Sequence, residues 1–100
     1  MTAGEKLQRS RNIIGKRLKE ARQLHFPPLT QDQLSGKLAS KGLELDRVAI
    51  AKIETGIRCV FDYEVKALAA ALKVDVKWLL GIAGSPGPSK RLVGEGKRRL

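Results

Sequence analysis

The sequence has few of the side chains that build catalytic or metal sites. It contains one cysteine, Cys59, and one histidine, His25, among 100 residues. A single thiol excludes a disulfide within the chain, and two isolated ligands do not make a zinc site. We expect Cys59 to be an inert, partly packed thiol beside Val60, because cysteine packs as a small hydrophobe. No nucleophile motif accompanies His25, so the sequence predicts neither an enzyme nor a bound metal or cofactor.

Long apolar runs are also missing. No stretch approaches the roughly 20 residues that a membrane-spanning helix needs. Residues 1–12 are polar and contain no apolar segment typical of a signal peptide. We therefore expect a cytoplasmic protein with no membrane partner. The length allows a single domain with one small core and leaves no room for a separate catalytic or ligand-binding domain.

Acidic residues are few beside the basic ones. Ten Asp and Glu stand against 20 Lys and Arg, and the formal net charge is +10. Such a balance favours a polyanionic partner, and both nucleic acid and an anionic membrane surface satisfy it.

The two ends of the chain carry no core-forming pattern. Residues 1–11 lack an apolar period and predict a mobile arm. Residues 83–100 combine a Pro/Gly linker with a basic run and a single acid, Glu95. This composition predicts a disordered tail, which either keeps the protein soluble or grips DNA without sequence preference. The basic residues of this tail are Lys90, Arg91, Lys97, Arg98 and Arg99.

Between these ends, residues 12–82 predict an all-α, compact domain of five helices. Apolar side chains recur at helical spacing, and no strand pattern or internal repeat occurs. We expect Leu43 and Leu45 to tuck under the core, and Trp78 to be a core residue rather than a stacking platform for single strands. The expected helices span about 12–24, 31–41 and 47–55, followed by one that Asp62 caps and one from Asp75 to Gly81.

Start and stop signals define the second and third helices most clearly. Thr30 and Gln33 have the spacing of a capping box, in which each side chain accepts a hydrogen bond from the other's backbone N–H. Asp46 is the expected N-cap of the third helix, and Gly56 supplies the left-handed residue that ends it.

The expected third helix has two different faces. Ile50 and Ile53 lie on one side and belong to the core. The opposite side carries small and basic residues, which suit entry into a DNA major groove. The residues of this outer side are Val48, Ala51, Lys52 and Thr55.

Five segments follow one another along the chain: Leu18-Lys19-Glu20-Ala21-Arg22, Leu29-Thr30-Gln31, Ile50-Ala51-Lys52-Ile53-Glu54-Thr55-Gly56, Leu68-Ala69 and the stretch from Leu72 to Gly81. In this order, they resemble the Cro/CI-type helix-turn-helix family, also called the XRE family of bacterial and phage regulators. The resemblance spans residues 13–81. It implies a lambda-repressor-like domain whose second and third helices form the DNA-reading pair.

The resemblance also implies roles for single residues. The residues expected to contact base edges are Arg47, Val48, Ala51 and Lys52. Those expected to contact phosphates are Gln31, Thr55 and Arg58. Arg22 and Glu54 are expected to form a salt bridge between the first and third helices. Arginine and lysine donate to guanine O6 and N7, and small apolar groups pack on a thymine methyl, so the base-contact positions agree with elementary groove chemistry.

The leading hypothesis is a sequence-specific regulator of transcription that binds double-stranded DNA as a homodimer and acts as a repressor. One alternative is an antitoxin or adaptor that mainly binds another protein, for which Leu79, Leu80 and Ile82 offer a candidate apolar patch. Another is a protein that coats nucleic acid without sequence preference because of its charge.

Overall fold

The structure, a computed structural model, describes residues 10–82. Residues 1–9 of the expected arm and the whole expected tail, 83–100, lie outside the described residues. Within the described part the chain forms five helices and no strand, which confirms the prediction of a compact all-α domain. The helices are α2 (Gly15–Leu24), α3 (Gln31–Ser40), α4 (Arg47–Glu54), α5 (Asp62–Leu72) and α6 (Val76–Leu79).

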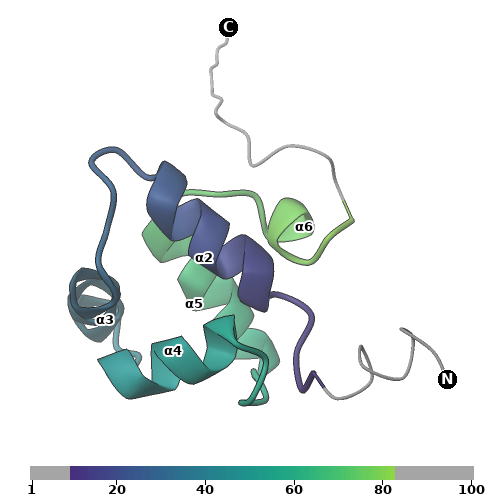
Figure 1. Cartoon of the computed structure of the whole chain (residues 1–100). Helices are drawn as coiled ribbons and strands as arrows, with labels where there is room; N and C mark the ends of the chain where they lie inside the picture. The colour runs from purple at the N-terminus through teal and green to yellow at the C-terminus, as the bar shows by residue number, and fades with distance from the viewer. Residues whose placement is uncertain (1–9, 83–100) are drawn as a thin grey trace, which may run out of the picture.

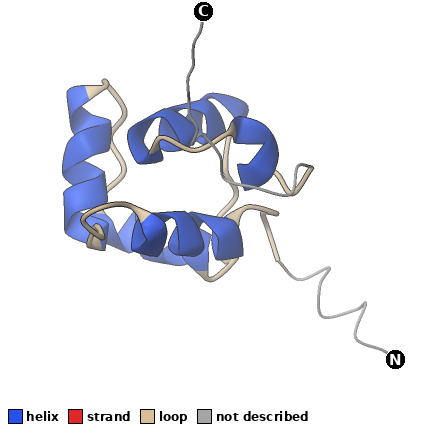
Figure 2. Ribbon diagram, turned by 90° about the horizontal axis from the view of Figure 1, so that it is seen from above, coloured by secondary structure: helices blue, strands red, loops and turns tan. Residues whose placement is uncertain are grey.

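The helices surround one core. Helix α2 packs against α4, α5 and α6, and α3 packs against α4 and α5 (Figure 1). Seen from above, α3 stands across one end of the other helices (Figure 2). Buried apolar side chains from all five helices and from the loops fill the centre. These are Ile14, Leu18, Ala21, Leu29, Leu34, Leu38, Leu45, Ile50, Ile53, Leu68, Ala69, Ala71, Leu72, Trp78 and Leu79.

Local signals explain most helix ends. Thr30 Oγ1 accepts from the backbone N–H of Gln33 at 3.0 Å, and Gln33 Oε1 accepts from the N–H of Thr30 at 2.8 Å, so the predicted capping box is present. Asp46 and Asp75 accept from backbone N–H groups at the starts of α4 and α6, also as predicted. Gly56 has a φ of 82°, the left-handed conformation that glycine adopts without strain.

Two expected helix starts are wrong. Helix α2 begins at Gly15 rather than near residue 12, because the Asn12 carboxamide accepts from the N–H groups of Ile14 and Gly15 and caps the helix from outside. Asp62 is the first residue of α5 and not its cap. The N-cap is Phe61, whose backbone N–H donates to the Glu64 carboxylate at 2.9 Å.

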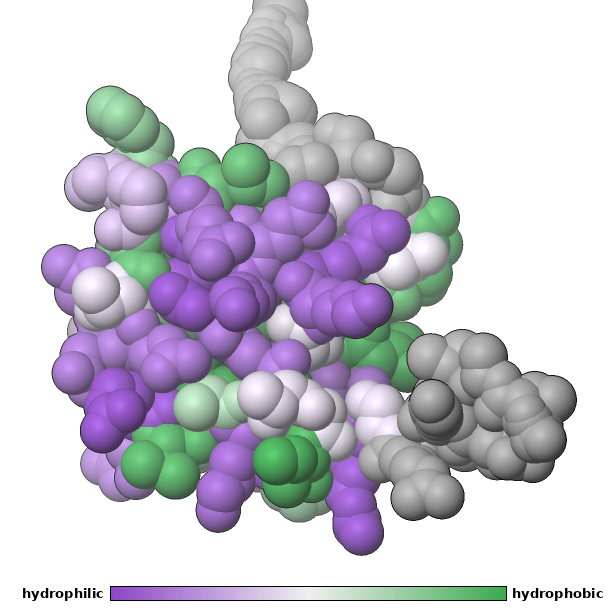
Figure 3. Space-filling model, in the orientation of Figure 1, coloured by the Kyte–Doolittle hydropathy of each residue, from purple (hydrophilic) through white to green (hydrophobic). Residues whose placement is uncertain are grey.

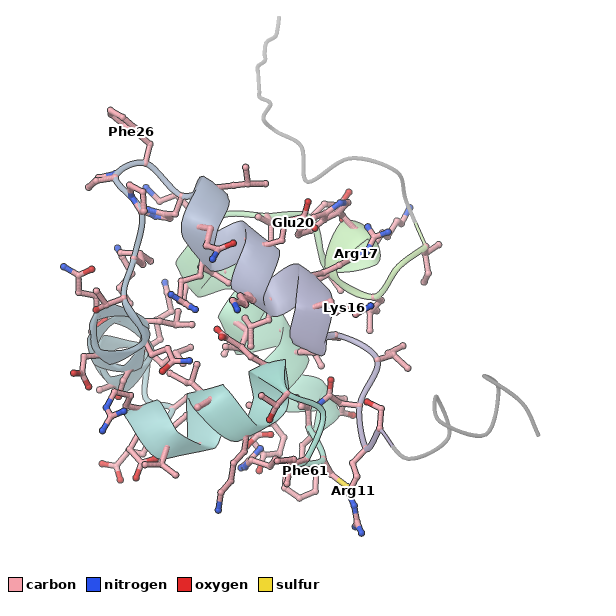
Figure 4. All side chains as sticks on the ribbon, in the orientation of Figure 1. Arg11, Lys16, Arg17, Glu20, Phe26 and Phe61 are labelled. Atoms are coloured by element: carbon pink, nitrogen blue, oxygen red, sulfur yellow. The ribbon has the colours of Figure 1, made fainter. Side chains whose placement is uncertain are left out.

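The burial of single side chains agrees with the sequence prediction at Leu43, Leu45 and Trp78 but not at Cys59. Leu45 is buried and Leu43 half-buried, as predicted. Trp78 is 3% exposed, and Arg17 lies over its ring with the guanidinium carbon 5.2 Å from the centroid (Figure 4). By contrast, Cys59 is exposed rather than partly packed.

The described residues offer no group of histidine, cysteine and acidic side chains that could hold a metal ion. Over the same part of the chain, none of the helices has the length and apolar character needed to cross a bilayer.

Gly15 and Gly36 differ sharply in what an added methyl group would meet. A Cβ at Gly15 would run into the backbone carbonyl oxygens of Ile53 and Glu54, whereas nothing lies within 4 Å of a Cβ at Gly36. We predict that Gly36→Ala stabilises the domain by about 0.5–1 kcal/mol, because alanine loses less backbone freedom on folding. Gly15→Ala should destabilise it by about 1–3 kcal/mol, the usual range for overpacking. Urea unfolding of the two variants measures both effects, and equal shifts for both would contradict this account.

Candidate nucleic-acid interface

The outer face of α4 presents the predicted base-contact residues together. Asp46 Oδ1 accepts from the N–H of Ala49 at 2.8 Å and fixes the start of the helix. Arg47 and Lys52 are exposed, Val48 is 50% exposed and Ala51 is half-buried. On a helix these four positions share one side. They form the reading face, by which we mean Arg47, Val48, Ala51 and Lys52.

The surface along α4 mixes apolar and polar groups. In the space-filling view, green hydrophobic and purple hydrophilic side chains alternate along the lower edge, where α4 runs (Figure 3). Phe61 and Arg11 project at the same lower side, beside the end of α4 (Figure 4). The rings of Phe61 and Tyr63 stack with centroids 5.6 Å apart, and both are more than half exposed. This aromatic stack was not expected from the sequence.

The Glu54 carboxylate joins three helices at the inner end of the interface. Arg22 donates to it twice, from Nε to Oε2 at 2.8 Å and from Nη2 to Oε1 at 3.0 Å. The Gln31 side-chain amide donates to Oε1 at 3.1 Å. Arg22 also donates to the Leu29 carbonyl oxygen at 3.0 Å. The predicted salt bridge between the first and third helices is therefore present, and it includes Gln31 of α3.

The Arg22–Glu54 ion pair is buried, so both charges depend on their partners inside the domain. The Arg22 and Glu54 side chains are 13% and 4% exposed. The hydrogen bond to Glu54 raises the pKa of Arg22; burial opposes this rise, and the charge of Glu54 adds to it. A buried carboxylate needs such partners, because removing it from water is costly. Helices α2, α3 and α4 are thus held at fixed positions relative to one another.

Gln31 has a structural partner as well as its expected phosphate role. Its amide nitrogen carries two hydrogens, and one of them points to Glu54. The side chain is half-buried at the first position of α3. Gln31 therefore orients α3 against α4, and one of its two amide hydrogens is left to donate to a phosphate.

A second junction, missed by the sequence reasoning, holds the end of α4. The Asn12 amide donates to the carbonyl oxygens of Ile53 at 3.0 Å and Arg58 at 2.8 Å. The N–H of Arg11 donates to the Gly56 carbonyl at 2.7 Å. Ser10 and Arg11, expected in a mobile arm, thus contact the domain. The asparagine before an apolar run was a visible capping signal, but its partners 41 and 46 residues away were not.

Arg58 forms an ion pair with Glu64 at the start of α5. It donates to Glu64 from Nη1 at 3.0 Å and from Nη2 at 3.1 Å. Glu64 is 3% exposed. Burial alone would raise the pKa of Glu64, but the hydrogen bonds from Arg58 and from the Phe61 N–H outweigh it, and the pKa is lowered. Arg58 thus has a structural partner beside its expected phosphate role, and its own side chain remains 29% exposed.

The remaining predicted contacts lie on the surface. Thr55 is exposed, and its hydroxyl donates to the Ala51 carbonyl at 3.1 Å. Arg47 Nε lies 3.8 Å from Asp32 Oδ1, and both side chains are mostly exposed. An exposed pair of this kind contributes little to stability. Arg47 is therefore free to exchange Asp32 for another partner.

Compared with known protein families, characterised proteins and solved structures, this chain gives no match.

We predict that Glu54→Ala lowers the free energy of unfolding by about 3 kcal/mol, near the lower end for stranding one partner of a buried pair. Arg22 keeps its bond to the Leu29 carbonyl, which limits the loss. Glu54→Gln, which keeps the shape of the side chain, is the matched control and should lose less. A double-mutant cycle with Arg22→Ala measures the coupling, and strict additivity of the two losses would show that the pair contributes nothing.

We also predict acid sensitivity from Glu64. Because its folded-state pKa lies below the ordinary value of 4.5, its contribution is present above that pH and is lost as pH falls through the lowered pKa. Glu64→Gln should be less stable than wild type at pH 7 and should lose less stability between pH values of about 5 and 3. Urea unfolding across this range tests it. Exposed Glu44→Gln controls for the loss of a carboxylate, and parallel pH profiles for wild type and Glu64→Gln would contradict the prediction.

Proposed function

We propose that this protein is a sequence-specific regulator of transcription that inserts α4 into the major groove of double-stranded DNA. The observation that carries the proposal is the reading face. It stands exposed on an eight-residue helix, Arg47–Glu54, while Ile50 and Ile53 on the inner side are fully buried. Val48 stands half exposed between the two cations, and this mixture of apolar and basic groups suits base edges and thymine methyls in a major groove.

Rigid placement supports a reading role. The Glu54 hydrogen bonds hold α4 to α2 and α3, and the Asn12 bonds hold its last turn. A helix fixed in this way loses little freedom on binding, so its contacts add to affinity rather than offset ordering. Arginine and lysine on its outer side can donate to guanine, and Val48 can pack on a thymine methyl.

The proposal includes a homodimer acting as a repressor on a two-fold operator. One short helix reads only a few base pairs, and two half-sites one turn apart raise both affinity and specificity. The charge of the chain, +10, supports rapid association with DNA and a strong dependence of affinity on salt.

A protein-interaction module is the second candidate, and the stacked Phe61 and Tyr63 rings favour it. They are 57% and 59% exposed, with Ile57 at 62% nearby in the chain. The apolar patch expected from the sequence is weaker than predicted, because Leu79 is fully buried and only Ile82 is largely exposed.

Selection of bound duplexes from a random pool at physiological salt tests the proposal directly. A regulator should return one consensus with two-fold symmetry and bind it far more tightly than random duplexes. Binding that differs little between selected and random sequences would favour the nonspecific coating protein. Absence of DNA binding would favour the interaction module.

We predict that Arg47→Ala and Lys52→Ala each reduce discrimination between the selected site and random DNA by about 1–3 kcal/mol, the value of a good base contact. The fold should survive, because both side chains are exposed. Lys77→Ala on α6 removes the same charge away from the reading face and is the matched control. Competition titrations measure the ratio, and equal weakening on selected and random duplexes would contradict a reading role for α4.

A further inference from the structure

An apolar groove lies between α5 and α6. Its volume is about 470 Å³, and it is lined by Asp62, Val65, Lys66, Val76 and Leu80. Val65 and Leu80 pack against the core on one side and remain partly exposed on the other, and Val76 is 37% exposed. None of these residues belongs to α4. The groove and the reading face are therefore built from different residues.

The charges on this groove match a second copy of the same surface. Asp62 and Lys66 are four residues apart on α5, so they lie on one side of the helix. Within the described residues, neither makes an ion pair. A two-fold axis places one surface against an identical one. If the two α5 helices run antiparallel, Asp62 of each copy faces the partner's Lys66.

We propose that this groove is the self-association surface of the chain. Two copies pair about a two-fold axis, Val65, Val76 and Leu80 supply the apolar contact, and two reciprocal Asp62–Lys66 ion pairs set the antiparallel register. The inference rests on the homodimer of the proposed function and names the surface that forms it. It is measured without DNA, so the two proposals fail separately.

Sedimentation equilibrium of the full chain at low ionic strength tests the self-association. The concentration series extends to about 1 mM, so that a weak dimer is also detected. Wild type should dimerise. In the Asp62→Lys dimer, the new lysine of each copy faces the partner's Lys66. In the Lys66→Asp dimer, the new aspartate of each copy faces the partner's Asp62. Each should raise the dimer dissociation constant at least about tenfold, because like charges across an interface repel. Thermal unfolding checks that each variant is folded.

An equimolar mixture of Asp62→Lys and Lys66→Asp is the decisive arm. In a mixed pair every lysine faces an aspartate, so the mixture should dimerise about as well as wild type although neither variant does so alone. The double variant carrying both changes should dimerise as well. Val76→Glu places a carboxylate in the groove and should abolish pairing. Ile13→Glu, at a 77% exposed position outside the groove, is its control and should not.

Three results would overturn the inference. The first is a wild type that stays monomeric throughout, the result expected if a different protein or another segment of this chain fills the groove. The second is single charge variants that dimerise as wild type does, which would place the interface elsewhere. The third is a mixture that dimerises no better than its components, which would exclude the antiparallel register. If duplex selection returns no consensus while the mixture dimerises, the DNA-reading proposal fails and the surface stands.

Discussion

The Glu54 carboxylate is the group around which the domain is arranged. Its side chain is 4% exposed, so nearly all of its hydration is lost on folding. That loss is tolerable only when donors surround the charge. Arg22 of α2 and Gln31 of α3 supply those donors, and Glu54 itself is the last residue of α4. The need to satisfy one buried charge therefore fixes three helices at once.

The same end of α4 is held a second time through backbone groups. Gly15 lets the start of α2 approach the carbonyl oxygens of Ile53 and Glu54, and Asn12 donates to the first of them. The Ile53 carbonyl oxygen also accepts from the N–H of Gly56 at 3.0 Å, so Asn12 is its second donor. The segment before α2 thus adds a hydrogen bond to the last turn of α4. The exposed side of α4 needs no further support to keep its direction.

Signals confined to a few neighbouring residues could be interpreted from the sequence. The Thr30–Gln33 capping box, the Asp46 and Asp75 caps, the left-handed Gly56 and the apolar stripe through Ile50 and Ile53 all depend on short spacing, and all are present. The Arg22–Glu54 pair was reached only through the family resemblance, because the two residues are 32 positions apart.

Features that depend on a turn or on distant packing could not be derived. Arg58 reaches Glu64 across the start of α5, a spacing that helix periodicity does not reveal. The N-cap of α5 lies at Phe61 rather than at Asp62. Leu79 is fully buried although it lies near the end of the domain, because α6 packs on α2 and α5.

The buried Arg22–Glu54 pair and the buried Glu64 carboxylate have a practical consequence for handling the protein. Mobile ions screen exposed charges over a Debye length of about 10 Å at 0.1 M salt but act much less on charges enclosed by protein. Ionic strength should thus leave the helices in place while it competes with the exposed cations for phosphate. We therefore expect salt to elute this protein from a polyanion or an ion-exchange resin while the domain remains folded.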